Sequence, residues 1–153
     1  MRTLTHYNVG NELAAVGRTD EAIQQYEDAI RLDPGNALAN HNLGSLLASR
    51  GEYEPAERHY REALRINPTN TQALFNLGRV LRAQRDWVGA IDATRRGLEL
   101  EPNRPEACAL IGGAYLELAE PDKAIAYFER ALRLDPNSTE ARDGLTRARS
   151  GGG

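Results

Sequence analysis

The chain has 153 residues, of which 41% are hydrophobic and 27% charged, and this length and composition fit one globular domain. Its 19 Lys and Arg against 22 Asp and Glu give a formal net charge of -3, which argues against a nucleic-acid-binding protein, because such proteins carry a basic surplus. One cysteine, Cys108, excludes an internal disulfide and fits a reducing compartment. No apolar run has the length of a membrane span or the form of a secretory signal. These features predict a soluble, cytoplasmic domain that binds neither nucleic acid nor a membrane.

Three residue types recur in one register with a spacing of 34 residues. They are the prolines Pro34, Pro68, Pro102 and Pro136, the glycines Gly10, Gly44, Gly78 and Gly112, and the alanines Ala22, Ala56, Ala90 and Ala124. The repeat divides the chain into windows 3–36, 37–70, 71–104 and 105–138. A fixed period of this length is typical of a solenoid of stacked units.

Each window contains two predicted helices. The first ends near Gly17 in window one and near Gly51 in window two, where a left-handed helix terminus favours glycine. Arg85 and Ala119 occupy that place in windows three and four, so the turn must tolerate a side chain there. The second helix of each window ends at the residue before the repeated proline.

Short polar residues at the window junctions predict where the next helix begins. Asn36, Asn70 and Ser138 are good N-caps, and Pro105 suits a first helical position. After window four, residues 139–149 predict a capping helix with a thin apolar stripe of Ala141, Leu145 and Ala148. Residues 151–153 read as a flexible tail. The first helix begins almost at Met1 without a cap, which we interpret as a sign that the module comes from a longer protein.

The pattern resembles the tetratricopeptide repeat (TPR) family. In window two the resemblance is carried by Leu43, Gly44, Leu47, Ala56, Tyr60, Ala63 and Pro68, and windows one and four match in the same way. Window three is the poorest, because Thr94 and Gly97 stand where the other windows have an aromatic residue and an alanine. The resemblance implies an all-α fold, a right-handed α-solenoid of four helix hairpins plus the capping helix, forming a single domain over residues 1–150.

The repeated small residues predict close packing inside each hairpin. Each repeated glycine faces the repeated alanine, and aromatics such as Tyr26 then fill the gap to the next helix. In window three, Thr94 leaves an aromatic-sized space unless Trp87 or a neighbour fills it. We also expect Gly97→Ala to be tolerated and stabilising, since glycine costs about 1 kcal/mol relative to alanine in a helix.

In this family the first helices line a concave groove, and helical periodicity selects the side chains that face away from the core. The candidate peptide-binding residues are Asn8, Asn11, His41, Asn42, Ser45, Gln72, Phe75, Asn76, Arg79 and Arg82. Asn8, Asn42 and Asn76 share one place in three successive windows, and a carboxamide can pair with both the N–H and the C=O of a peptide. This ladder is similar to the one in the repeat arm of O-linked N-acetylglucosamine transferases. The alternative is that these asparagines brace adjacent helices.

A second family precedent, the carboxylate clamp of co-chaperones, does not fit. Asn11 and Asn42 match its asparagines, but Tyr7, Gln72 and Asn76 stand where the clamp has cations. Arg79 and Arg82 project from one helix face and either receive a carboxylate in another geometry or are simply solvated.

Three further residue types are expected to be structural. Cys108 is predicted to be a buried small side chain, His6 a hairpin-packing residue and His59 a surface residue, and the histidine spacing fits no metal site. Trp87 is expected to brace the two helices of its hairpin.

The sequence therefore predicts a non-catalytic scaffold that binds an extended protein segment and needs no cofactor. Two alternatives remain open: a substrate-recruiting arm of a larger protein or enzyme, and self-association through the terminal helices. The absence of a phosphate-binding loop, a zinc motif or a nucleophile–base pair argues against catalysis within this chain.

Overall fold

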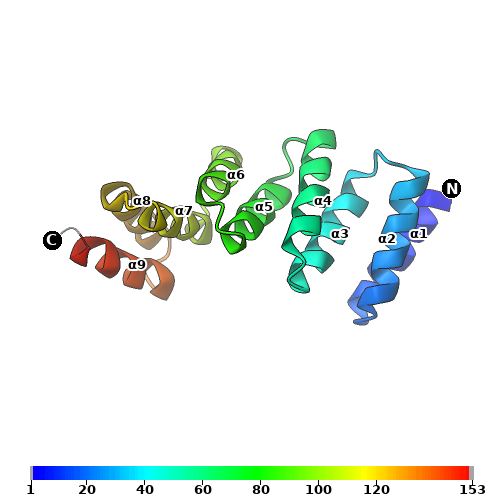
Figure 1. Ribbon diagram of the computed structural model, residues 1–153, viewed down its shortest axis with the longest axis horizontal. Coiled ribbons are helices and arrows are strands. Elements are labelled where there is room, and N and C mark those ends of the chain that lie inside the picture. Colours follow the sequence, from blue (N-terminus) through cyan, green and yellow to red (C-terminus); the bar gives the residue numbers. More distant parts are fainter. Residues whose placement is uncertain (1, 152–153) are drawn as a thin grey trace. The chain divides into compact units, whose positions relative to one another are not determined.

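A computed structural model describes residues 2–151, with side chains from residue 4 onward, and over this range the chain is all-α. Its helices are α1 (Arg2–Ala15), α2 (Thr19–Leu32), α3 (Ala37–Ser49), α4 (Tyr53–Ile66), α5 (Thr71–Ala83), α6 (Trp87–Leu100), α7 (Pro105–Glu117), α8 (Pro121–Leu134) and α9 (Thr139–Ser150) (Figure 1). Each predicted window holds two helices, and α9 is the predicted additional helix. The predicted tail at 151–153 has Gly152 and Gly153 outside the described residues.

The turn inside each hairpin places one residue in the left-handed region. Gly17 and Gly51 have φ of 77° and 78°, as their positions in the sequence predict. Arg85 and Ala119 adopt φ of 62° and 57° at the corresponding places. The turn therefore keeps its geometry without glycine, at the cost of a backbone conformation that side chains with a Cβ disfavour.

The junctions between hairpins are closed by side-chain hydrogen bonds. Asn36, Asn70 and Ser138 each accept from the backbone N–H three residues later, at 2.9, 3.0 and 3.2 Å, and so act as the predicted N-caps. Asp86 does the same for α6 by accepting from the Gly89 N–H at 2.9 Å, a cap that was not predicted from the sequence. Pro105 lies in the first turn of α7, as predicted.

In windows one, two and four the repeated glycine of the first helix lies against a ring of the second helix in the same hairpin, whereas in window three Gly78 lies against Thr94. A Cβ on Gly10 would lie 2.7 Å from Tyr26 Cε1, one on Gly44 would lie 3.1 Å from Tyr60 Cε1, and one on Gly112 would lie 2.9 Å from Phe128. The expected contact with the next helix is present at Tyr26, whose hydroxyl accepts from Asn42 of α3, and the contact with the glycine of the same hairpin is an additional one. Phe128 also packs on Gly144 of α9 and therefore makes both contacts.

The chain divides into two compact units, residues 1–73 and 74–153, with α5 beginning in the first and continuing in the second. In the first unit, Tyr26 and Tyr60 are among the largest fully buried side chains. In the second, α9 covers α7 and α8 with Ala141, Leu145 and Ala148, which confirms the predicted apolar stripe. The prediction of one domain over residues 1–150 stays a prediction.

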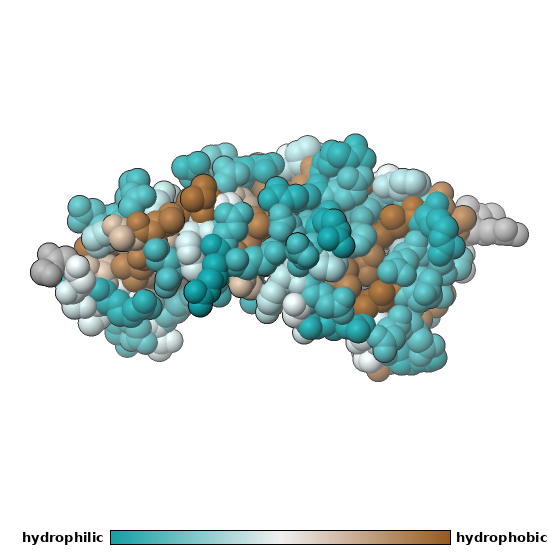
Figure 2. Space-filling model, in the orientation of Figure 1, coloured by the Kyte–Doolittle hydropathy of each residue, from teal (hydrophilic) through white to brown (hydrophobic). Residues whose placement is uncertain are grey.

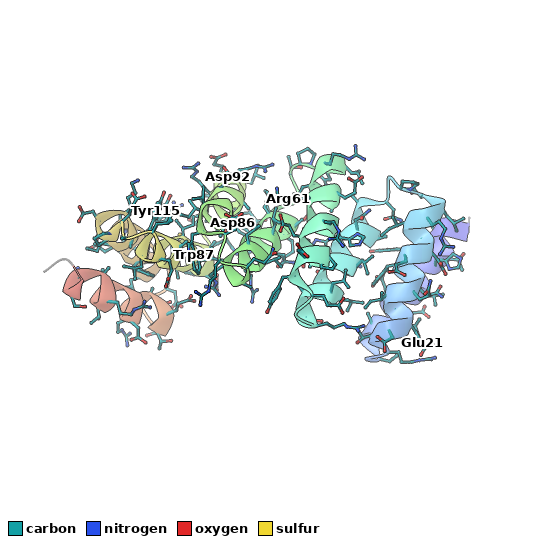
Figure 3. All side chains as sticks on the ribbon, viewed as in Figure 1. Glu21, Arg61, Asp86, Trp87, Asp92 and Tyr115 are labelled. Carbon is teal, nitrogen blue, oxygen red and sulfur yellow. The ribbon has the colours of Figure 1, made fainter. Side chains whose placement is uncertain are left out.

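The outward surfaces of the helices are mostly hydrophilic in the view of Figure 2, with hydrophobic residues showing in smaller patches. Exposed i,i+3 ion pairs such as Arg18–Glu21 account for part of this surface, and Figure 3 shows Glu21 near the beginning of α2. Of the helices in residues 2–151, none combines the length and apolar character that a membrane crossing requires.

Candidate functional site

The predicted site residues lie on the first helices of the hairpins, in both units. In the first unit, Asn8 and Gln72 are exposed, whereas Asn11, His41, Asn42 and Ser45 are half-buried. In the second unit, Arg79 is exposed, Asn76 and Arg82 are half-buried, and Phe75 is buried. Helices α1 and α3 thus carry one set of candidate residues, and the part of α5 from residue 74 onward carries another.

Asn42 is the centre of a polar cluster in the first unit. Its Nδ2 donates to Asn11 Oδ1 at 2.9 Å and approaches the hydroxyls of Tyr7 and Tyr26 at 3.5 Å each. Tyr26 in turn donates to Asn11 Oδ1 at 2.7 Å. Burial raises the pKa of the Tyr26 phenol, although the bond from Asn42 acts in the opposite direction. The cluster ties α3 to α1 and α2, so the bracing alternative has a direct contact in its favour at Asn42.

Asn8 occupies the place of Asn42 one repeat earlier but is exposed. The three asparagines of the predicted ladder are therefore not equivalent in their surroundings. Asn8 presents its carboxamide to solvent, whereas Asn42 commits its nitrogen to protein oxygens. Asparagine is a poor residue in the middle of a helix, and among the described residues no side-chain hydrogen bond of Asn8 is found that would correspond to the bracing bond of Asn42.

Ser45 has a role parallel to that of Asn11. Tyr60 donates to Ser45 Oγ at 3.0 Å, just as Tyr26 donates to Asn11 one repeat earlier. In window four the ring is Phe128, which has no hydroxyl, and the corresponding residue of α7 is Gly113. The residue after the repeated glycine is thus a hydrogen-bond acceptor where the ring carries a hydroxyl, and glycine where the ring is phenylalanine. This pairing is present in the sequence pattern but was not among the predictions.

His41 lies beside this cluster on α3. Its ring packs edge-on against Tyr60, with the centroids 5.7 Å apart. Its Nδ1 is buried, with no hydrogen-bond partner among the described residues, and burial lowers the pKa of the imidazole. His41 is therefore held neutral and acts as a packing ring with one unsatisfied nitrogen.

Phe75, predicted to lie on the exposed side of its helix, belongs to the core of the second unit instead. Its side chain is 6% exposed, and a Cβ added at Gly97 would lie 2.6 Å from its Cε1. The Arg104 guanidinium lies over the ring, 4.9 Å from its centroid. Phe75 thus packs against Gly97, whereas Thr94 lies against Gly78. The contact between Phe75 and Gly97 also removes the basis for expecting Gly97→Ala to stabilise the protein.

The two arginines of α5 have different surroundings. Arg82 Nη1 lies 3.0 Å from Glu140 Oε1 on α9, a pair within the second unit whose side chains are 41% and 57% exposed. Arg79 is exposed, and no ion pair to it is found among the described residues. Arg82 thus pairs with a carboxylate of the chain itself, and the expectation that these arginines receive a carboxylate of a ligand stays a prediction.

Two inter-helix hydrogen bonds in the first unit were missed by sequence reasoning. His6 Nδ1 lies 2.8 Å from Gln25 Oε1, and His59 Nδ1 lies 3.0 Å from Asn40 Oδ1. His6 therefore packs within its hairpin, as predicted. His59 is not a plain surface residue, because it is half-buried and joins α4 to α3; burial, with Arg58 nearby, lowers its pKa.

The remaining candidates are structural. Cys108 is fully buried, and its burial raises the pKa of the thiol, as expected of a small packing side chain. Trp87 is half-buried at the start of α6 next to Asp86 and packs against the core cluster of the second unit (Figure 3). Across residues 2–151, the His, Cys, Asp and Glu side chains form no group of three that could hold a metal ion.

The hairpins, their turns and their glycine–aromatic contacts define a helical repeat protein. Sequence profiles described as tetratricopeptide repeat match residues 7–71, 42–107 and 81–148. The chain therefore belongs to the tetratricopeptide repeat family.

Comparison with solved structures agrees with this assignment. A crystal structure of MamA superposes with a TM-score of 0.95 at 24% identity, covering 99% of this chain and 82% of that one. YrrB, whose structure is described as a TPR protein with an unusual peptide-binding site, gives 0.89 at 25% identity and covers 95% and 75%. The Cut9–Hcn1 hetero-tetramer of the APC/C gives 0.81 at 24% identity and covers 97% and 30%. A search of curated proteins gave no significant match.

Proposed function

We propose that the chain is a non-catalytic scaffold that binds an extended peptide segment on the first helices of its hairpins. The observation that carries the proposal is that the side chain of Asn42 is held in place by hydrogen bonds within the protein. Its nitrogen donates to protein oxygens, which fixes the side chain, so its carbonyl oxygen keeps one orientation in which it can accept a peptide N–H. A group that is already ordered loses little conformational entropy on binding.

The surroundings of Asn42 support a peptide rather than a charged ligand. Helix α3 contains no Asp, Glu, Lys or Arg, and Asn8, at the corresponding place on α1, presents an exposed carboxamide. Neutral donors and acceptors suit peptide groups, whose dipoles need partners but bring no net charge. Such a surface forms hydrogen bonds with the peptide backbone more than with side chains, so we expect it to bind peptides of many different sequences.

Membership of the tetratricopeptide repeat family supports a protein-interaction scaffold in general. A peptide-binding site in YrrB and a protein complex in Cut9–Hcn1 are consistent with the proposal, although both describe those proteins. The proposed scaffold requires no cofactor and no catalytic group. Its affinity is expected to be modest unless several contacts act together.

The test is a peptide-display selection in parallel on the wild-type chain, on an Asn8→Ala, Asn42→Ala double variant and on Asn103→Ala. Asn103 is an exposed loop asparagine, so its variant controls for the loss of a surface carboxamide. All three proteins are first compared by thermal melting, because Asn42 also braces helices. We expect peptides that the wild type and Asn103→Ala recover and the folded double variant loses. Equal recovery by all three would remove the asparagines from the site, and no recovery by any would contradict peptide binding.

Self-association is a second candidate, because α1 exposes apolar side chains. Leu4 is 65% exposed, and Val16, just beyond the end of α1, is 71% exposed. Light scattering over a range of concentrations would detect assembly, with Leu4→Ser expected to reduce it. Val88→Ser, which removes a 66% exposed valine from α6, is the matched control. A mass equal to one chain at all concentrations would reject this candidate.

A further inference from the structure

The ion pair between Arg82 and Glu140 joins two helices that are far apart in the sequence. Arg82 is in the last turn of α5 and Glu140 is in the first turn of α9, with Nη1 and Oε1 3.0 Å apart. Most of the other ion pairs among the described residues lie within one helix or one turn, such as Arg65–Glu62. The Arg82–Glu140 pair is therefore a tertiary contact of the second unit.

Arg79 provides a second positive charge on the same side of α5. Residues three apart on a helix are neighbours on its surface, so Arg79 and Arg82 project together. Arg79 is exposed, and within the described part of the chain no carboxylate pairs with it. With one carboxylate for two guanidinium groups, this part of α5 keeps an excess of one positive charge.

We propose that Arg79 and Arg82 form a subsite for a carboxylate of the bound peptide, and that Glu140 occupies Arg82 until such a ligand replaces it. This inference rests on the proposed peptide-binding function and adds a preference to it. Within the second unit, the arginines of α5 would select peptide segments that carry Asp or Glu.

Exchange of one carboxylate for another is feasible because the pair is in contact with solvent. The side chains of Arg82 and Glu140 are 41% and 57% exposed, so an incoming carboxylate reaches the guanidinium without opening the core. The exchange keeps the ion pair at Arg82 and adds an attraction to Arg79, so an acidic ligand gains where a neutral one does not. Glu140 in turn raises the threshold for binding, because it competes for the same guanidinium.

Glu106 offers a control that the repeat itself supplies. It stands one repeat before Glu140, in the first turn of α7, and is also exposed. Glu106→Gln changes the net charge by the same amount as Glu140→Gln, and no ion pair of Glu106 is found among the described residues. Any difference between the two variants therefore reports the specific contact with Arg82 and not the overall charge.

The experiment uses the full chain and the tightest peptide with an Asp or Glu from the display selection. Three forms of this peptide are synthesised. The first keeps its Asp or Glu and has an amidated C-terminus, and the second replaces that residue by Asn or Gln and is also amidated. The third has the same Asn or Gln but a free C-terminal carboxylate. Dissociation constants are measured for the wild type and for Glu140→Gln, Glu106→Gln and Arg82→Gln. We expect Glu140→Gln to tighten the acidic peptide about two- to fivefold and to leave the neutral peptide unchanged, since exposed ion pairs contribute at this level. Arg82→Gln should weaken only the peptide that carries a carboxylate.

The outcomes separate this inference from the proposed function. If Glu140→Gln changes binding no more than Glu106→Gln, or if the selected peptides show no preference for Asp or Glu, the subsite is wrong while peptide binding stands. If the free C-terminal carboxylate restores the affinity of the neutral peptide, the subsite is supported and its source is a chain end. If no peptide is recovered at all, the proposed function fails and the inference fails with it.

Discussion

Phe75 lies against the backbone of Gly97, so close that a single added methyl group on Gly97 would approach Cε1 to 2.6 Å. The ring comes from α5 and the glycine from α6, at a position where the other windows have alanine. Tyr60 packs over Gly44 in window two, whereas in this contact of window three the ring is supplied by the first helix and the small residue by the second. The ring of Phe75 thus occupies the space that a side chain at position 97 would need.

Gly97→Ala is therefore expected to destabilise the protein, contrary to what helix propensity alone predicts. The gain of about 1 kcal/mol in helix propensity is outweighed by overpacking of a buried ring, which costs about 1–3 kcal/mol. Chemical denaturation measures the change. In the Phe75→Leu background the same substitution should be less harmful, and equal losses in both backgrounds would show that the ring is not the cause.

Ala119→Gly is expected to stabilise the protein by about 0.5–1 kcal/mol, because Ala119 has a φ of 57° that glycine adopts without strain. The reverse change, Gly51→Ala, should destabilise by a similar amount. A Cβ at Gly51 would have nothing within 4 Å, so its effect would report backbone strain alone. Thermal melting of both variants checks the pair, and a loss of stability in Ala119→Gly would contradict the account.

Asn42→Ala and Asn8→Ala should change stability in opposite directions. Removing Asn42 deletes the donor to Asn11 and leaves part of a half-buried cluster unsatisfied, at a cost of about 1 kcal/mol. Removing the exposed Asn8 replaces a poor helix former by the best one, with a gain of about 0.5 kcal/mol. Urea unfolding resolves the difference. A loss at Asn8 as large as that at Asn42 would mean that Asn8 also braces the fold.

Stability should fall as the pH is lowered through about 6.5 towards 5. Burial lowers the pKa of His41 and of His59 in the folded chain, so below the ordinary histidine pKa of about 6.5 the unfolded chain binds protons that the folded chain does not. Well above that pH both residues are neutral in the unfolded chain as well, so their contribution to the pH dependence disappears. Melting temperatures from pH 8 to pH 5 measure the slope.

The repeat suggests its own replacements for these two histidines. Phe75 and Gln25 occupy the places that correspond to His41 and His59, so His41→Phe combined with His59→Gln should keep the packing and reduce the slope. A variant with the wild-type slope would show that other groups control the response to pH.

Cys108 should resist a thiol reagent in the folded chain and react at the ordinary rate in denaturant. The side chain is fully buried, and burial raises the pKa of the thiol, which lowers the fraction of reactive thiolate. The rate of modification by an aromatic disulfide with and without urea measures this protection. Fast reaction in buffer alone would indicate that α7 opens readily.

The period of 34 residues was enough to predict the helices, because turn glycines, N-caps and prolines act through neighbours in the sequence. Asn36 and Ser138 could be assigned as caps for this reason. Contacts that depend on which side chain reaches across a hairpin were harder. The burial of Phe75 depends on Gly97, where the other windows have alanine, and a pattern built on what recurs does not predict such an exception. The bond between His59 and Asn40 joins positions that recur, but the residue types are exchanged relative to His6 and Gln25, so the pairing was not visible in the repeat.

The candidate site was less predictable than the fold for a related reason. Helical periodicity placed Arg79 and Arg82 on the surface, but the partner of Arg82 is 58 residues away and belongs to the capping helix. Likewise, the repeated asparagines share a register but not an environment, since Asn8 is exposed and Asn42 is bonded to Asn11. The position of each residue in the repeat was enough to select the candidate binding residues. Their burial and hydrogen bonds in the folded chain were needed to distinguish one candidate from another.

The bonds His6–Gln25 and Asn40–His59 join the same two positions of successive hairpins. In the first hairpin the imidazole is on the first helix and the carboxamide on the second, and in the second hairpin this order is reversed. A chimera that keeps whole hairpins would preserve both partnerships. Exchanging only the second helices would instead put Asn40 opposite Gln25, two carboxamides that can still form a hydrogen bond, but it would put His6 opposite His59. The interchangeable part in this stretch of the chain is thus the two-helix hairpin, because exchanging single helices would place two imidazoles opposite each other even though every helix has the right length.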